Sequence, residues 1–111
     1  MKVKLYDIAH ARSGDKGANT NVGLIFKSTE LYEWAKDNLT DVAVKSHFGS
    51  IVKGKVIRYK LPNLSAFNFI LEDSLSGGGS ETLQIDAQGK TYGQALLMME
   101  VDVPDELIIE D

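Results

Sequence analysis

The chain has 111 residues, of which 43% are hydrophobic and 25% are charged, and its formal net charge is −4. This size suits a single domain over residues 1–111 with a proper core, so we do not expect disorder. The acidic balance argues against a general nucleic-acid or anionic-membrane binder. Cysteine is absent, which excludes disulfides and thiolate chemistry and fits the cytoplasm. No apolar leader and no run near the ~18 residues of a membrane span occurs, so we expect a soluble protein.

The first predicted strand runs from about Lys2 to Ala9, where polar and apolar residues alternate. A polar loop is predicted over residues 10–20, because His, Arg, Asp, Lys, Ser and two Gly crowd into its first part. A charged, glycine-rich loop between apolar strands belongs at the end of a sheet. The segment Asn21–Phe26 is nearly all apolar and predicts a central strand, in which Gly23 suggests a close approach by backbone or side chain.

Two helices are predicted next, over Glu30–Asn38 and Asp41–Phe48, because apolar residues recur there at helical spacing. Ser28 or Thr29 is a suitable N-cap for the first helix and Thr40 for the second, which Gly49 stops. The two helices can form one bent unit that packs on one side of a sheet.

A long strand is predicted over Ile51–Leu61, ended by Pro62, which has no N–H to donate. Asn63 is then predicted to cap a further helix that Gly77–Gly79 end. Phe67 and Phe69 cannot share one helix face at a spacing of two, so one of them is expected to leave the core for a second buried surface. The apolar residues on the main face of this helix are Leu64, Phe67, Ile70 and Leu71.

The tail is predicted to contain a short strand at Glu81–Asp86, a polar turn at residues 86–90, a helical turn from Thr91 and a strand that ends before Pro104. Two helices on one face of an antiparallel sheet of about four strands make a two-layer α+β sandwich. A ferredoxin-like arrangement fits this element order best, and the strand order stays open.

Three segments together resemble a known family. They are DIAHARSGDKG at 7–17, RYKLPNLSAFNF at 58–69 and DAQGKT at 86–91. Their order and spacing resemble the C-terminal domain of the acyclic terpene utilisation (AtuA-like) family, which also occurs as a stand-alone small protein like this chain. The resemblance implies a ferredoxin-like fold over about 4–103. Larger members carry an additional N-terminal domain and are associated with acyclic terpene catabolism through acyl-CoA intermediates, but the resemblance assigns no reaction or cofactor to this small domain.

The polar loop predicts a site for an anionic small molecule. An arginine fork and a lysine charge suit a carboxylate or phosphate, and glycine amides can approach such a ligand closely. The turn at residues 86–90 contributes if it meets the loop in space. The predicted ligand-binding residues are Arg12, Ser13, Gly14, Lys16, Gln88 and Lys90. The structural alternative is internal pairing, in which Arg12 bonds Asp15 or Asp7 and Lys16 likewise finds a partner within the loop.

The candidate catalytic residues are His10 and Asp15, either of which can act as a general acid or base. Ser13 is the one evident nucleophile beside His10, and a structural histidine is the simpler interpretation. His47, on a predicted helix, is taken as structural. With two His and no Cys we predict no metal site.

Two functions remain open, beside a purely structural role that the sequence does not exclude. The first is a small non-catalytic accessory or ligand-binding subunit, acting as a homo-oligomer or with a larger AtuA-type protein in acyl-CoA or terpenoid catabolism. The alternative is an enzyme or enzyme fragment that binds an acyl-CoA or phosphorylated molecule. The sequence does not give the substrate or the partner.

Overall fold

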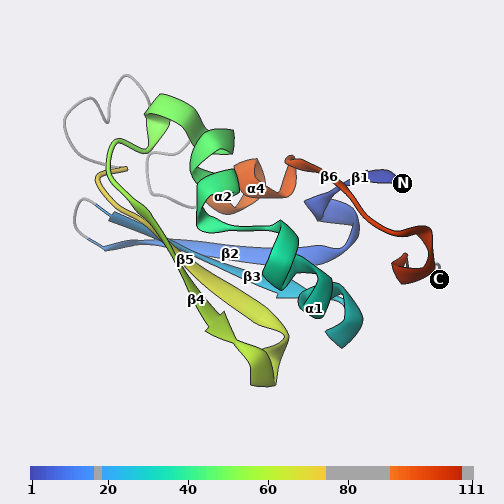
Figure 1. The fold of residues 1–111 in the computed structure, drawn as a ribbon. Helices are drawn as coiled ribbons and strands as arrows, with labels where there is room; N and C mark the ends of the chain where they lie inside the picture. The colour runs from blue at the N-terminus through green and yellow to red at the C-terminus, as the bar shows by residue number, and fades with distance from the viewer. Residues whose placement is uncertain (17–18, 75–90, 109–111) are drawn as a thin grey trace.

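The computed structural model describes residues 1–16, 19–74 and 91–108 (Figure 1). A four-stranded sheet lies against the helices, and a two-stranded sheet joins segments from the two ends of the chain. The strands are β1 (Lys2–Lys4), β2 (Ala9–Lys16), β3 (Asn19–Phe26), β4 (Val56–Leu61), β5 (Ala66–Leu71) and β6 (Glu100–Asp102). The helices are α1 (Thr29–Asn38), α2 (Asp41–Phe48) and α4 (Thr91–Leu97), with 3-10 turns at Leu5–Asp7, Gly49–Ile51, Pro62–Leu64 and Asp105–Leu107.

The strand order of the larger sheet is β2-β3-β5-β4, and every neighbouring pair is antiparallel. β3 and β4 therefore run parallel to each other with β5 between them, and α1 and α2 connect these two strands. This is the split β-α-β arrangement found in ferredoxin-like folds. The predicted two-layer α+β class with a four-stranded antiparallel sheet is confirmed, and a third, short helix, α4, packs against β2.

The predicted polar loop is wrong over most of its length, because the residues after Ile8 form β2. The predicted first strand also breaks after Lys4, where the 3-10 turn begins. β2 is an edge strand that pairs with β3, from Ala9 opposite Phe26 to Lys16 opposite Asn19. An edge strand with one face turned away from the helices needs few apolar residues, so its sequence resembled a loop.

The helix predicted from Asn63 onward is also wrong, because this part of the chain forms β5 in the middle of the sheet. Phe67 and Phe69 are both fully buried in the core, so neither leaves it as a helix would have required. Their spacing of two residues is the period of a strand. Pairing with β3 on one side and β4 on the other selects that period over the helical one.

Both predicted central helices are confirmed, and of the two candidate caps for the first helix the structure selects Ser28 over Thr29. The Ser28 Oγ accepts a hydrogen bond from the backbone N–H of Leu31 at 3.1 Å, at the start of α1. The Thr40 Oγ1 accepts the N–H of Ala43 at 3.1 Å, at the start of α2. Gly49 follows α2 with a φ of 60°, a conformation that glycine adopts without steric cost.

The remaining predictions have mixed outcomes. β4 begins at Val56 and not at Ile51, and it ends directly before Pro62 as predicted. The helical turn and the strand predicted for the tail are confirmed as α4 and β6. The predicted strand Glu81–Asp86 and the stop at Gly77–Gly79 lie outside the described residues.

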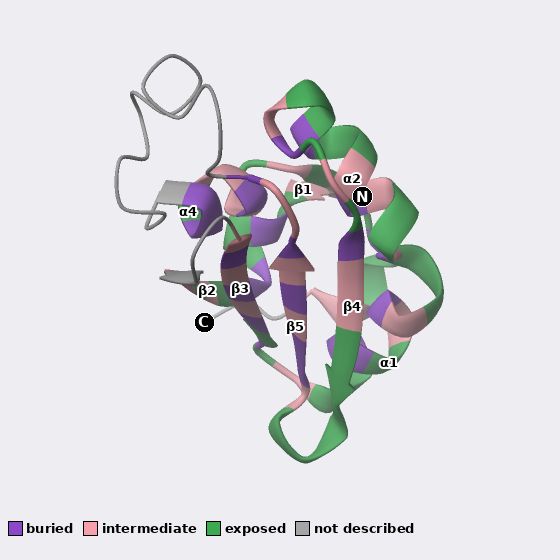
Figure 2. Cartoon of the chain, turned by 90° about the vertical axis from the view of Figure 1, so that its left-hand side faces the viewer, coloured by how far each residue is buried: buried purple, intermediate pink, exposed green. Residues whose placement is uncertain are grey.

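The two faces of the four-stranded sheet have different surroundings. One face packs on the helices; there Arg58 lies 4.6 Å from the Phe67 ring and donates hydrogen bonds to the carbonyls of Lys36 and Leu39 at 3.0 and 2.8 Å. The opposite face is turned toward the viewer in Figure 2, with none of the described helices or strands in front of it. We call it the open face. The buried residues of β3 and β5 on the helix side are Thr20, Val22, Leu24, Phe26, Phe67, Phe69 and Leu71.

Candidate functional site

Alternate residues of the four strands line the open face in three rows that cross the sheet. In the middle row Arg12 is opposite Gly23, Gly23 is opposite Asn68, and Asn68 is opposite Tyr59. Because successive side chains of a strand point to opposite faces, these residues face away from the buried side. The flanking rows are His10, Ile25, Ala66 and Leu61 on one side, and Gly14, Asn21, Ile70 and Ile57 on the other.

Arg12 stands exposed at the edge of the middle row. Among the described residues, no carboxylate lies within ion-pair distance of its guanidinium. Asp7, one of its predicted internal partners, accepts a hydrogen bond from the backbone N–H of Lys4 at 3.0 Å. Asp15, the other, is described only in its backbone, where it pairs with Thr20. As far as the described residues go, the fork of N–H donors on Arg12 is therefore available to a further group.

Two glycines on the open face have no packing role among the described residues. A Cβ added to Gly23 would meet only the Arg12 carbonyl oxygen, at 3.9 Å, and one added to Gly14 would meet nothing within 4 Å. Neither glycine has a φ in the left-handed region. Gly54 differs, because its Cβ would lie 2.8 Å from the Glu72 carbonyl oxygen. The fold thus explains Gly54 but not the two bare positions beside Arg12.

The rest of the open face is largely apolar. Tyr59 is 52% exposed, Leu61 39% and Ile25 37%. Ile70 and Asn68 are partly buried, and Asn68 makes no hydrogen bond with its side chain to any part of the chain that the structure describes. The Arg12 guanidinium and the Asn68 amide are therefore surrounded by aliphatic and aromatic surface. The sequence singled out Arg12 and Gly23 separately, and only the strand pairing brings them together with Asn68.

Ser13, the nucleophile considered beside His10, lies on the other face of β2. His10 lies on the open face, whereas Ser13, three residues later on the same strand, faces α4. The Ser13 Oγ accepts a hydrogen bond from the backbone N–H of Gly93 at 3.2 Å, so this hydroxyl fixes the helix on the sheet. His47 packs similarly, with its Nε2 2.8 Å from the Ala95 carbonyl oxygen, which supports its structural interpretation.

The other predicted ligand-binding residues are only partly described. Gly14 lies in an extended strand opposite Asn21, so its amide is not part of a turn that could cradle phosphate. The backbone of Lys16 pairs with Asn19, and its side chain is outside the description. Gln88 and Lys90 lie outside the described residues altogether, so their predicted meeting with Arg12 stays a prediction.

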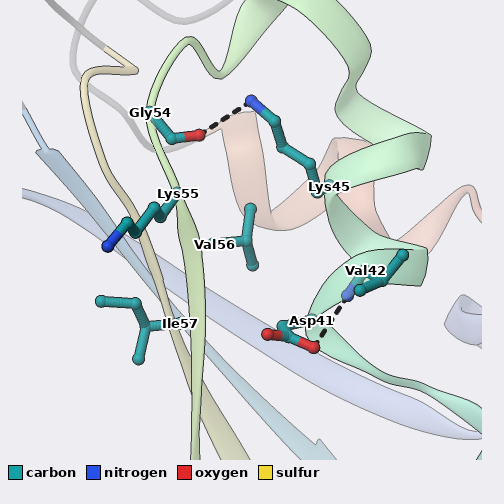
Figure 3. A pocket seen from close by; sticks show the side chains of 7 residues that line it. All are labelled: Asp41, Val42, Lys45, Gly54, Lys55, Val56 and Ile57. Atoms are coloured by element: carbon teal, nitrogen blue, oxygen red, sulfur yellow. Dashed lines mark hydrogen bonds between the residues drawn. The ribbon is translucent and has the colours of Figure 1, made fainter.

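A cavity of about 450 Å³ lies between α2 and β4 (Figure 3). The Lys45 ammonium beside it donates hydrogen bonds to the carbonyls of Val52 and Gly54, the latter at 2.8 Å. A carboxylate oxygen of Asp41 accepts the Val42 N–H at 2.9 Å. Lys45 therefore holds the α2–β4 connection in place, whereas Asp41 bonds, among the described residues, only within the first turn of α2. The cavity offers less for recognition than the open face, where Arg12 has no described partner.

Comparison with protein families finds a match to the AtuA ferredoxin-like domain over residues 3–102. The chain belongs to this family. The match confirms the resemblance carried by the three sequence segments, and with the four-stranded sheet it confirms the ferredoxin-like fold class. Searches of curated proteins and of solved structures gave no match.

Two further features of this AtuA ferredoxin-like domain concern membranes and metals. Within the described residues, no helix has the length and apolar character needed to cross a membrane. No group of three or more His, Asp or Glu residues in the described ranges is placed to hold a metal ion.

Proposed function

We propose that this AtuA ferredoxin-like domain is a non-catalytic accessory subunit that docks an AtuA-type protein through its open face. The observation that carries the proposal is an apolar sheet face that no described element covers and that bears an Arg12 guanidinium with no described counter-ion. By family resemblance, we place this assembly in acyl-CoA or terpenoid catabolism in the cytoplasm.

The composition of the open face supports docking. An antiparallel sheet that faces water on one side normally places polar residues there. Here Ile25, Tyr59 and Leu61 are exposed together, with Ile57 and Ile70 beside them. Contiguous apolar surface of this kind marks interaction sites, and aromatic residues and arginine are enriched in protein interfaces. A protein surface can cover such a face over all four strands.

The same geometry favours binding over catalysis. His10 and Ser13 point to opposite faces of β2, so the sheet separates the Ser13 hydroxyl from the His10 imidazole. General acid–base catalysis needs its groups within hydrogen-bond reach of one substrate. The exposed Arg12 is compatible with the alternative, an anionic small molecule such as an acyl-CoA, which the experiments below also test.

The proposal is tested by coexpressing the chain with an AtuA-type protein from the same organism and measuring the affinity of the purified complex. Tyr59→Glu places a charge on the open face and is expected to weaken the complex at least about tenfold. Val42→Glu is the matched control, because Val42 is an apolar residue on α2 with 72% exposure. Urea unfolding of both variants checks that the fold is retained.

Three results would overturn the proposal. The first is that the two proteins do not associate. The second is a complex that Val42→Glu weakens while Tyr59→Glu does not. The third is a homo-oligomer that Tyr59→Glu dissociates, because a second copy of the chain would then occupy the open face.

A further inference from the structure

We infer that the middle row of the open face is a carboxylate-binding site that receives an Asp or Glu side chain of the docking partner. The site consists of Arg12, Gly23 and Asn68, with Gly14 beside them. This inference rests on the proposed docking function and adds the chemistry of the central contact.

The geometry provides two donors with bare backbone between them. Arg12, Gly23 and Asn68 stand directly opposite one another on three neighbouring strands. Adjacent strands are about 4.8 Å apart, so the backbones of Arg12 and Asn68 are separated by about 10 Å with glycine halfway. A carboxylate above Gly23 is then within reach of the Arg12 guanidinium from one side and the Asn68 amide from the other.

Gly23 is the feature that indicates a ligand from outside the chain. Glycine in a strand interior weakens the strand, and it commonly marks a place where another group approaches the backbone closely. No described group of this chain makes that approach at Gly23, since an added Cβ would have a single neighbour at 3.9 Å. Gly14, diagonally across the β2–β3 pair on the same face, is equally unobstructed. Two bare positions lie beside an arginine that has no ion-pair partner among the described residues, and they leave room for a ligand atom.

The charge of the open face favours a carboxylate over a phosphate as the bound group. The three rows contain one arginine and one histidine and no carboxylate of their own. A buried ion pair is tolerated only when its charges are matched and hydrogen-bonded, and the surrounding apolar residues would exclude water on docking. The single charge of a carboxylate matches one guanidinium and fits its planar fork. A dianionic phosphate would keep an unmatched charge at the same position.

The apolar residues around the site favour a protein side chain as the source of the carboxylate. Tyr59 ends the middle row, and Ile25 and Ile70 flank Gly23 and Asn68 diagonally. An acidic residue between apolar neighbours on the partner would meet both parts of this surface at once. Such a pair fixes the register of an interface and disfavours partners that lack the charge.

Two blocked tripeptides probe the site: acetyl-leucyl-glutamyl-leucyl-amide and its glutamine analogue. Amide chemical shifts of the isotope-labelled protein are followed by NMR during titration of each peptide. The glutamate peptide is expected to shift the amides of Gly14, Gly23 and Asn68, with an affinity at least about tenfold above that of the glutamine peptide. Arg12→Gln should remove this preference. Lys55→Gln, which removes an exposed cation just before β4, should leave it intact.

Gly23→Ala adds a second, independent test, because it should weaken glutamate-peptide binding while the protein stays folded. Inorganic phosphate and coenzyme A are titrated in parallel. Equal binding of the two peptides, or a preference that survives Arg12→Gln, would overturn the carboxylate site. Tighter Arg12-dependent binding of phosphate or coenzyme A would overturn it in favour of a phosphorylated small molecule.

The failure of this inference can be distinguished from failure of the proposed function. If the peptides bind alike but Tyr59→Glu still breaks the AtuA-type complex, the docking face stands and the carboxylate contact is wrong. If the glutamate preference holds but Tyr59→Glu leaves the complex intact, the contact chemistry is right and the proposed docking is wrong.

Discussion

Replacing Gly23 by alanine tests whether the fold or a ligand requires the bare position on the open face. The new methyl group would meet only the Arg12 carbonyl oxygen at 3.9 Å, which is ordinary van der Waals contact, and the backbone is outside the left-handed region. Under these conditions a glycine-to-alanine change stabilises a protein by roughly 0.4–1 kcal/mol, because the unfolded chain loses conformational freedom. We therefore expect Gly23→Ala to raise the free energy of unfolding by about 0.5 kcal/mol.

Gly54→Ala is the matched control. Its methyl carbon would lie 2.8 Å from the Glu72 carbonyl oxygen and 2.9 Å from the Glu72 Cβ, so the chain must shift. Overpacking of this kind costs about 1–3 kcal/mol. Urea unfolding at constant m-value measures both variants. A loss of more than about 0.5 kcal/mol in Gly23→Ala would show that the fold itself needs this glycine, which would remove the main argument for an external group at the site.

Three further variants test the structural interpretation. Arg58→Ala removes two hydrogen bonds from a charged group to carbonyls near the end of α1. It should lower the free energy of unfolding, measured by urea unfolding, by about 2 kcal/mol, and a loss below about 0.5 kcal/mol would contradict these contacts. Phe67→Ala, at the centre of the core, should cost about 3–5 kcal/mol by the same assay; a mild effect would contradict the placement of Phe67 in β5. The Met1 ammonium is hydrogen-bonded to Asp102 at 3.0 Å and lies 3.2 Å from a carboxylate oxygen of Asp105; the two carboxylates raise its pKa above 8.0. The stabilising contribution of the Met1 ammonium is therefore complete below pH 8 and is lost as the pH rises through the raised pKa. The thermal midpoint should fall between pH 8 and 10, and it should fall less in Asp102→Asn than in the parent protein. Equal falls in the two proteins would contradict the pairing.

Local signals along the chain were sufficient for the helical layer. Ser28 and Thr40 indicate the starts of α1 and α2, and Gly49 indicates the end of α2. These features depend on a few neighbouring residues and on hydrogen bonds that the local chain makes with itself, so they can be read without knowing the fold.

The sheet could not be predicted as well, because its strands are defined by partners far along the chain. Residues 63–71 satisfy a helical spacing as well as a strand spacing, and the pairing of Phe67 with Leu24 and with Lys60 decides between them. The polar sequence of β2 resembled a loop because one side of this edge strand meets no helix. His10 and Arg12 are exposed on the open face, so the sequence has no apolar residues at these positions to indicate a strand.

The candidate site could not be predicted for the same reason: it is formed by strands that are far apart in the sequence. Arg12 and Gly23 each carried a separate and ambiguous signal in the sequence, and Asn68 joins them only in the folded sheet. Their alignment in one row depends on the order β2-β3-β5-β4, which a single sequence leaves open. The strand alternation of residues 56–61 could have indicated Tyr59, since it lies on the face opposite to the Arg58 that covers the core.

The most direct test of docking is an NMR cross-saturation experiment on the complex with an AtuA-type protein, read at the isoleucine methyl groups of this chain. The account predicts that the signals of Ile25, Ile57 and Ile70 lose intensity, because all three lie on the open face. The signal of Ile51, in the turn after α2, should keep its intensity. Loss at Ile51 with the three open-face signals unchanged would place the partner elsewhere and contradict the account.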